Sequence, residues 1–199
     1  MCQLENAHPQ TPGQQEVQRC VSRQLPMLFW VALALFVVAC LQRNPSVAAP
    51  DEYKVKAAFV YNFAKFTTWP AEAFAKSDAP FVIGIVGKDP FGGAIDDTMK
   101  GKTVETHPVT IRRVKWAEAK DCHLLFVSGS EGSKTRDMDP VKTVPILTVG
   151  EVSGFAQRGG IINFVSEDEK IKFEINPEAA KRANLSISSK LLSLAKIVK

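Results

Sequence analysis

The stretch 159–176 most constrains the fold, because it predicts a β-hairpin whose second strand has two very different sides. Two runs of strand-forming residues, Gly159–Val165 and Lys170–Asn176, are separated by the polar turn Ser166–Glu169. In the second run charged residues alternate with apolar ones, and this period of two gives a strand one solvent face and one core face. The alternating charged residues are Lys170, Lys172 and Glu174. We therefore predict that this charged face points outward, and these three residues are candidates for partner binding.

Two helices are expected to follow the hairpin. Asn176, Pro177 and Glu178 form a helix start, with Asn as N-cap, Pro at the first helical position and an acid near the positive dipole end. The closing run 187–198 has apolar residues at helical spacing, which predicts a second amphipathic helix. Because neither element can bury its apolar side alone, the upstream part of the chain must supply the surface on which both pack.

Upstream, apolar runs of strand length alternate with segments of helical periodicity. The expected strands are Phe81–Gly87, Val109–Val114, Cys122–Val127 and Val144–Val149, and the expected helices are Lys54–Thr68 and Ala94–Met99. Strands that alternate with short helices indicate the α/β class, and the hairpin adds antiparallel strands at one side. We predict a single domain over residues 50–199, with a mixed β-sheet of about five or six strands, helices on both faces, and the C-terminal hairpin plus two helices.

Residues 1–49 are interpreted as a leader. Two arginines precede the uncharged run Met27–Ala39, a pattern typical of a signal peptide. Two processing sites compete: a lipobox-like sequence ending at Cys40, which would be lipidated, and the small residues of Ser46–Ala48. An uncleaved anchor is a third interpretation, although the run is shorter than the ~20 residues that span a bilayer. We expect export with cleavage, and we favour a soluble product over a lipid-anchored one.

The domain offers little for metal or nucleophilic chemistry. A zinc site needs several Cys or His ligands, and the chain beyond the leader supplies His107, Cys122 and His123. Cys122 and His123 are consecutive in an expected strand, so their side chains point to opposite faces and cannot form a catalytic dyad. Cys122 is interpreted as a small buried hydrophobic residue, with a reactive or dimer-bridging thiol as the alternative. We therefore predict no catalytic residue, no metal and no cofactor.

The charges of the chain argue against nucleic-acid binding. The formal net charge is +4, and the Lys and Arg residues are scattered rather than gathered in a stripe with aromatic residues.

Two places are candidates for a small ligand. The loop Lys88–Gly93 follows an expected strand and precedes an expected helix, where phosphates often bind. Its candidate residues are Lys88, Asp89, Gly92 and Gly93. The loop lacks the Gly-Lys-Ser/Thr ending of a P-loop, so an ordinary strand-to-helix turn is the favoured interpretation. Asn163 is polar within an apolar strand; we expect it to cap a neighbouring backbone group, with ligand contact as the alternative.

An ordered set of short motifs covers nearly all of residues 51–198. The motifs are Lys56–Phe66 with Trp69-Pro70, Gly87–Gly92, Cys122–Phe126, Leu147–Val149, Gly159–Phe164, Phe173–Asn176 and Ile187–Leu192. Together, in this order, they resemble the YfiR-like family.

The resemblance implies a periplasmic regulator of cyclic-di-GMP signalling. The best-known relative inhibits an inner-membrane diguanylate cyclase by binding its periplasmic domain, and an outer-membrane lipoprotein relieves the inhibition. Relatives are dimeric, and some carry paired cysteines that form bridges; the single cysteine beyond the leader argues against such redox control here. We therefore expect a non-catalytic periplasmic protein that binds such a cyclase and represses its synthesis of cyclic-di-GMP, and that forms a homodimer. The alternative is a periplasmic sensor of a nucleotide or an amino acid.

Overall fold

The computed structural model describes residues 50–74, 76, 78–132, 135–168 and 170–199. The expected leader lies outside the described residues, and so does Cys40 with its expected lipidation.

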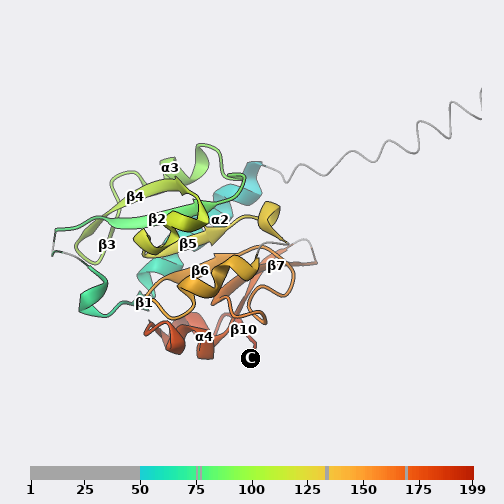
Figure 1. Ribbon diagram of the computed structural model, residues 1–199. Helices are drawn as coiled ribbons and strands as arrows, with labels where there is room; N and C mark the ends of the chain where they lie inside the picture. The colour runs from blue at the N-terminus through green and yellow to red at the C-terminus, as the bar shows by residue number, and fades with distance from the viewer. Residues whose placement is uncertain (1–49, 75, 77, 133–134, 169) are drawn as a thin grey trace, which may run out of the picture. The chain divides into compact units, whose positions relative to one another are not determined.

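The described residues form a mixed eight-stranded sheet in the order β10-β8-β7-β6-β5-β2-β4-β3 (Figure 1). From β4 through β2, β5 and β6 to β7 all neighbouring strands are parallel, whereas β7 pairs with β8, and β3 with β4, in antiparallel fashion. β1 and β9 form a separate antiparallel pair. The bounds are β1 Thr67–Thr68, β2 Phe81–Val86, β3 Thr103–Val104, β4 His107–Val114, β5 Leu124–Val127, β6 Leu147–Gly150, β7 Ile162–Glu167, β8 Lys170–Ile175, β9 Ser186–Ile187 and β10 Lys196–Ile197.

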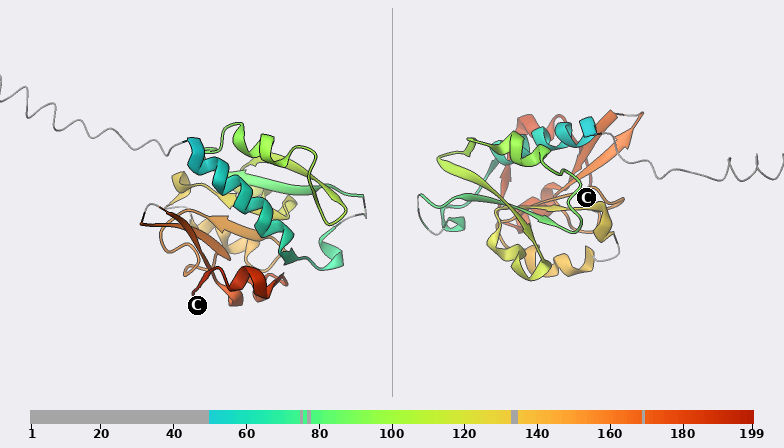
Figure 2. Two further views of the ribbon diagram at one scale, coloured as in Figure 1. Left: turned by 180° about the vertical axis from the view of Figure 1, so that it is seen from behind. Right: turned by 90° about the horizontal axis from the view of Figure 1, so that it is seen from above.

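Helices and helical turns cover both faces of this sheet (Figure 2). One face carries α2 (Pro50–Lys65), against which α3 (Ala94–Met99) packs. The 3₁₀ turns Trp116–Asp121 and Thr135–Val141 lie on the other face. After the hairpin come the short helices α4 (Pro177–Arg182) and α5 (Ser189–Leu192). The predicted α/β class with a mixed sheet is confirmed, although the sheet has more strands than the five or six expected.

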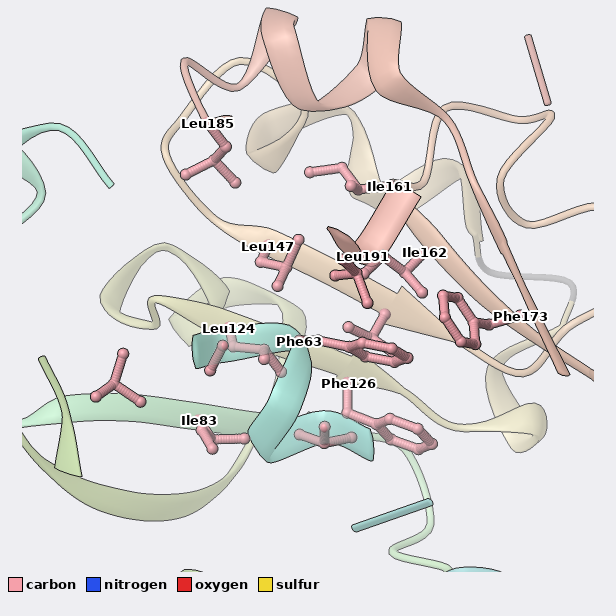
Figure 3. Packing of buried hydrophobic residues seen from close by; sticks show 14 of the residues in the cluster. Phe63, Ile83, Leu124, Phe126, Leu147, Ile161, Ile162, Phe173, Leu185 and Leu191 are labelled. Atoms are coloured by element: carbon pink, nitrogen blue, oxygen red, sulfur yellow. The ribbon is translucent and has the colours of Figure 1, made fainter. Parts of the chain in front are cut away.

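The larger hydrophobic core lies between α2 and the sheet (Figure 3). Phe63 of α2 is fully buried, and its ring centroid lies 5.4 Å from that of Phe164 and 5.0 Å from that of Phe173. Phe164 and Phe173 face each other across the β7–β8 hairpin. Burying one such side chain stabilises the fold by about 1.5–3 kcal/mol, so this aromatic cluster fixes the hairpin against the helix.

A smaller core lies on the opposite face of the sheet. It includes Leu125 and Val127 of β5, Met138 of a 3₁₀ turn, Cys122 and Phe155. Because β5 is apolar at every position, it supplies both cores, as expected of a central parallel strand.

The end of the chain differs from the second amphipathic helix that we predicted over 187–198. The helix is the single turn α5, which Ser188 caps, and the chain then forms β10 beside β8. Val198 continues this pairing by donating its backbone N–H to the carbonyl of Ile175. The β-branched Ile197 and Val198 favour a strand, and the otherwise unpaired edge of β8 offers the hydrogen bonds that a helix would have supplied internally.

The first helix also ends earlier than predicted. The expected helix over Lys54–Thr68 is observed as Pro50–Lys65, because Thr67 and Thr68 leave it to pair with β9. Both threonines are β-branched, and Trp69 precedes a proline, so this segment is biased toward an extended backbone.

Candidate functional site

The predicted loop Lys88–Gly93 is a strand-to-helix turn held by Arg113 of β4. The Arg113 guanidinium donates from Nε to Asp89 Oδ2 at 2.9 Å, and to both carboxylate oxygens of Asp96 at 3.0 and 2.6 Å. It also donates to the carbonyl of Gly92. Such a two-pronged contact matches the shape of the guanidinium to that of a carboxylate.

These contacts change what the loop offers to a phosphate. The hydrogen bond and charge of Arg113 hold the pKa of Asp96 below its usual value, so this carboxylate stays ionised near the loop. The other carboxylate oxygen of Asp89, Oδ1, accepts a hydrogen bond from the backbone N–H of Phe91. Gly92 and Gly93 are exposed, with open space where a Cβ would lie. Two acidic side chains thus surround the one guanidinium, which disfavours an anionic ligand; binding of a ligand by Lys88 and its neighbours stays a prediction.

A second cluster is built around Glu151, which directly follows β6 at the carboxyl ends of the parallel strands. Its Oε2 accepts a hydrogen bond from Lys56 of α2 at 2.9 Å and one from the Tyr53 hydroxyl at 3.2 Å. Its Oε1 accepts the backbone N–H of Gly129, in the turn after β5, at 3.0 Å. Ligands of open parallel sheets bind outside the carboxyl ends of the strands, so this is a favourable place for a site.

Lys56 is a buried cation in this cluster. It pairs with Glu52 one turn earlier at 2.7 Å as well as with Glu151, and its ammonium lies 4.5 Å from the centroid of the Tyr53 ring. Burial by itself lowers the pKa of Lys56, but the hydrogen bonds to the two carboxylates outweigh it, and the pKa lies above its usual value. Sequence periodicity places Lys56 on the first helix, but it does not indicate that Glu151 is its partner.

Asn163 lies in the middle of the sheet, in register with Gly150 of β6 and Glu174 of β8. Its side chain is 0% exposed, and neither its amide nitrogen nor its oxygen has a hydrogen-bond partner in the described part of the chain. The expected capping of a backbone group is therefore wrong. Asn163 and Glu174 both lie on the face opposite α2, because their sequence neighbours Phe164 and Phe173 fill the core beneath that helix.

A polar cavity of about 500 Å³ includes Asn163 among its lining residues. The hairpin contributes Asn163 and Glu174, and the segment after β6 contributes Glu151, Ser153 and Gln157. No residue of the Lys88–Gly93 loop lines it, so the two ligand sites proposed from the sequence are separate places. On the α2 side of the sheet, a cavity of about 320 Å³ shares Glu151 and is also lined by Lys56.

The three predicted partner-binding residues of β8 have different surroundings. Lys170 and Lys172 are exposed, and Lys172 pairs with Glu167 across the hairpin. Glu174 is only 6% exposed, which corrects the prediction that it points to solvent. It pairs with Lys196 of β10 at 3.2 Å and accepts a hydrogen bond from Gln157 at 3.1 Å. Two segments that the sequence pattern did not place there, β10 and the loop after β6, cover this end of β8.

An apolar strip lies along the outer side of α2 and continues onto the last residues of the chain. We define this α2 strip as Val55, Phe59, Phe66 and Leu194. Leu194 is 70% exposed and Val55 is 45% exposed, whereas Phe59 and Phe66 are half-buried. A shallow groove of about 190 Å³ is lined by Phe59, Phe66 and Leu194, and Lys190 stands at its side, 5.5 Å from the centroid of the Phe66 ring.

The strip agrees in part with what the sequence pattern suggests. The spacing of Phe59, Phe63 and Phe66 indicates a core stripe, and all three pack in the core, but only Phe63 is fully buried while the other two keep a half-exposed side. Leu194 belongs to the run expected to form an amphipathic helix, and its exposure follows from the early end of α5.

The cysteine, the metal-ligand types and the helices of the described residues complete the description of the site. Cys122 is a buried free thiol, and burial raises its pKa to about 11, so it is a poor nucleophile. Among the described residues, no three His, Cys, Asp or Glu side chains come together as a metal ion would require. No described helix has the length and the apolar character needed to cross a bilayer.

Comparisons with known proteins give distant likenesses among solved structures. A search of curated proteins gives no match. A conserved domain protein from Vibrio cholerae O1 biovar El Tor is 12% identical with a TM-score of 0.49, the match covering 74% of this chain and 60% of that one. An ABC domain from Streptococcus pneumonia, solved in complex with L-Trp, is 11% identical with a TM-score of 0.43, covering 59% and 55%. This chain thus spans less than two thirds of either protein.

A family model described as YfiR/HmsC-like (DUF4154) matches residues 53–196. The match begins within the first turn of α2 and ends at the first residue of β10, so it includes the hairpin and all the lining residues of both cavities except Glu52. The resemblance inferred from the ordered motifs is confirmed: this chain belongs to the YfiR/HmsC-like family.

Proposed function

We propose that this protein is a non-catalytic periplasmic regulator that binds the periplasmic domain of an inner-membrane diguanylate cyclase and represses its synthesis of cyclic-di-GMP. Membership of the YfiR/HmsC-like family supports the regulatory role. The observation that carries the proposal is the α2 strip, an exposed apolar surface on an otherwise well-packed domain. An apolar surface of this kind, with polar residues at its rim, marks a place where another molecule binds.

The chemistry of the α2 strip suggests the surface that it fits. Its centre is apolar, with Leu194 protruding and a shallow groove beside Phe59 and Phe66. Its rim is basic, because Lys54 and Lys190 flank the groove and the neighbouring one over Val55. The complementary surface on the cyclase would present apolar side chains that enter the groove and acidic residues at the edge. Removing apolar area from water contributes roughly 25 cal/mol per Å², whereas the charges mainly speed and orient association.

Repression requires more than binding. A protein shifts its partner toward an inactive arrangement only if it binds that arrangement more tightly than the active one. Changing the ratio of inactive to active cyclase from 1:99 to 99:1 requires the regulator to bind the inactive state roughly 10⁴-fold more tightly than the active one. An outer-membrane lipoprotein that competes for the α2 strip would relieve repression without any chemical step.

Substitutions at exposed positions of the α2 strip test this proposal. The double variant Val55→Glu with Leu194→Glu places two acids on the strip without touching the core, since both side chains are exposed. Thr110→Glu, at an exposed position of β4, is the matched control. Binding to the purified periplasmic domain of the cyclase is measured by calorimetry, and cyclic-di-GMP is measured in a deletion strain carrying each variant.

We expect the wild type and the control to bind the cyclase domain. The double variant should lose at least roughly tenfold in affinity, and cyclic-di-GMP should rise only in cells that carry the double variant. Equal binding by all three proteins contradicts the role of the strip. A deletion strain with unchanged cyclic-di-GMP contradicts the regulatory function itself. Light scattering on the same samples shows whether the strip instead joins two copies into a homodimer, in which case the double variant is monomeric.

A further inference from the structure

Two features make the polar cavity beside Asn163 a candidate binding site: a buried polar side chain that has no partner among the described residues, and a lining that is acidic. The cavity of about 500 Å³ lies on the sheet face opposite α2, beside the hairpin and the segment Glu151–Gln157. None of the four residues of the α2 strip lines it.

The Asn163 carboxamide has unmet hydrogen-bonding capacity. Its nitrogen can donate two hydrogen bonds and its oxygen can accept two, yet neither atom has a partner among the described residues. Folded proteins rarely leave such a group buried and unpaired, because its hydration is lost without compensation. By contrast, Thr148 on the neighbouring strand accepts the backbone N–H of Ile161 at 3.0 Å. The local sheet satisfies the side chain of Thr148 and leaves that of Asn163 unpaired among the described residues.

The charges of the lining select the kind of molecule. The lining contains the carboxylates of Glu151 and Glu174. Each is paired with a lysine that does not line the cavity: Lys56 at 2.9 Å for Glu151, and Lys196 at 3.2 Å for Glu174. Glu174 therefore offers an acceptor oxygen, Oε2, whose partner Gln157 also lines the cavity, while the charge of the two carboxylates disfavours an anion. A neutral or cationic ligand with hydrogen-bond donors is favoured.

We propose that this cavity binds a small, non-anionic molecule that carries an amide group. The ligand carbonyl accepts a hydrogen bond from Asn163 Nδ2, and the ligand N–H donates to Asn163 Oδ1 or to Glu174. This pairing matches the donor and acceptor that lie side by side on a carboxamide. The oxygen of any hydroxyl on the same ligand accepts from Ser153, whose side chain is exposed at the rim.

Gln157 is the residue to which we assign control of access to the buried amide. The Asn163 side chain is fully buried, so a ligand reaches it only after a neighbouring side chain turns aside. Gln157 is exposed, lines the cavity, and donates a hydrogen bond to Glu174 at 3.1 Å. A ligand amide can replace this hydrogen bond with an equivalent one, so the exchange has little energetic penalty. The variant Gln157→Ala, which has no such hydrogen bond to exchange, is therefore expected to bind the ligand about as tightly as the wild type.

Binding is tested on the purified domain with defined probes and with NMR chemical-shift mapping. Glycinamide is the cationic amide and N-acetylglucosamine the neutral one. N-acetylmuramic acid is the anionic comparison, because it differs from N-acetylglucosamine by a lactyl carboxylate. We expect saturable shifts at β7, at β8 and in the segment Glu151–Gln157 for the first two probes, and binding weaker by roughly tenfold or more for the acid.

Two variants locate the site. Asn163→Leu removes the unpaired amide with little change in volume, and Ser153→Trp narrows the entrance from an exposed position without altering the core. Thr110→Trp, at an exposed site on β4, is the control for the bulky substitution. We expect both cavity variants to lose binding and the control to keep it.

Three outcomes overturn the proposal. One is that neither amide probe binds and a high-resolution structure shows ordered water alone on Asn163. Another is that a probe binds equally well to Asn163→Leu and Ser153→Trp. The third is that the acid binds as tightly as N-acetylglucosamine. None of these results bears on the cyclase, whose binding is measured separately at the α2 strip.

Discussion

Lys56 Nζ lies 2.9 Å from Glu151 Oε2, and this ion pair joins the first helix to the carboxyl edge of the parallel strands. Both side chains are largely buried, and the same carboxylate also accepts the backbone N–H of Gly129. One residue thus ties together α2, the turn after β5 and the end of β6. The pair also lies between the two cavities, since Glu151 lines both.

Replacing Lys56 by Met is expected to lower the free energy of unfolding by about 3 kcal/mol, because Glu151 remains buried without its countercharge. Urea denaturation followed by circular dichroism measures the change. Lys181→Met is the control: its ion pair with Glu178 is exposed, and no measurable change is expected. The double variant Lys56→Met with Glu151→Leu should recover part of the loss. An equal, small effect of both single substitutions would show that the buried pair does not hold the helix in place.

The sequence predicts correctly those elements that are determined by residues close together in the chain. The hairpin follows from alternation and a polar turn, and the start of α4 follows from Asn176, whose side chain accepts the backbone N–H of Ala179 at 2.9 Å. The predicted bounds of α3 are confirmed. Each of these rests on residues within one turn or one strand of each other.

The predictions are wrong where the structure of a segment depends on contacts with residues far away in the sequence. β10 forms because the edge of β8 is free to pair, and Glu174 is buried because β10 and the segment after β6 cover it. Two-residue strands such as β1 and β9 are too short for periodicity to reveal. At the site, Asn163 stood out in the sequence as a polar residue in an apolar run, but Lys56 and Glu151 are 95 residues apart and nothing local links them.

Asn163→Leu is expected to leave the free energy of unfolding unchanged or to raise it by about 1 kcal/mol, because the substitution removes a buried group that has no partner. Thr148→Val is the matched comparison on the adjacent strand. It leaves the N–H of Ile161 unpaired and should destabilise the protein by about 1–2 kcal/mol. Urea titrations of both variants measure this difference. A clear destabilisation by Asn163→Leu would mean that the amide is satisfied in solution.

Two glycines with positive φ are expected to differ in their tolerance of alanine. Gly87, with φ +90°, follows β2, and an added Cβ would lie 2.6 Å from Ser130 Oγ and 2.8 Å from Glu131 Cγ. Gly92, with φ +55°, faces open space. We expect Gly92→Ala to cost about 1 kcal/mol from backbone conformation alone, and Gly87→Ala to cost about 3 kcal/mol because steric overlap is added. Thermal melts of the two variants test the order, and equal losses would contradict it.

Cys122 is expected to be unreactive in the folded protein. Its side chain is buried beside Gly84, and burial raises its pKa to about 11, so little thiolate is present near neutral pH. Iodoacetamide at pH 8 should therefore label the thiol slowly in buffer and rapidly in a denaturing concentration of urea. Mass spectrometry of timed samples gives both rates. Fast labelling of the native protein would restore the alternative of a reactive or bridging thiol.

His123 is expected to make stability depend on pH between neutrality and mild acid. The imidazole stacks on Phe74 and Phe81, its Nδ1 accepts the backbone N–H of Val82 at 3.0 Å, and its Nε2 lies 3.1 Å from the carbonyl oxygen of Ala73. Burial, helped by the nearby His107, lowers the pKa of His123 below its usual value. The unfolded chain therefore binds a proton more readily than the folded one, and the contribution of His123 is fully present above about pH 6.5 and is lost as the pH falls below it.

The variant His123→Gln tests this window, because it removes the titrating ring. We expect it to be less stable than the wild type at pH 7, and its free energy of unfolding to change less between pH 7 and pH 5. Asp96→Asn is the comparison: Arg113 lowers the pKa of that carboxyl group, so its contribution is present above about pH 4 and is lost only at lower pH. Urea denaturation at a series of pH values separates the two windows. If His123→Gln keeps the wild-type slope between pH 7 and pH 5, another group controls the acid sensitivity of the fold.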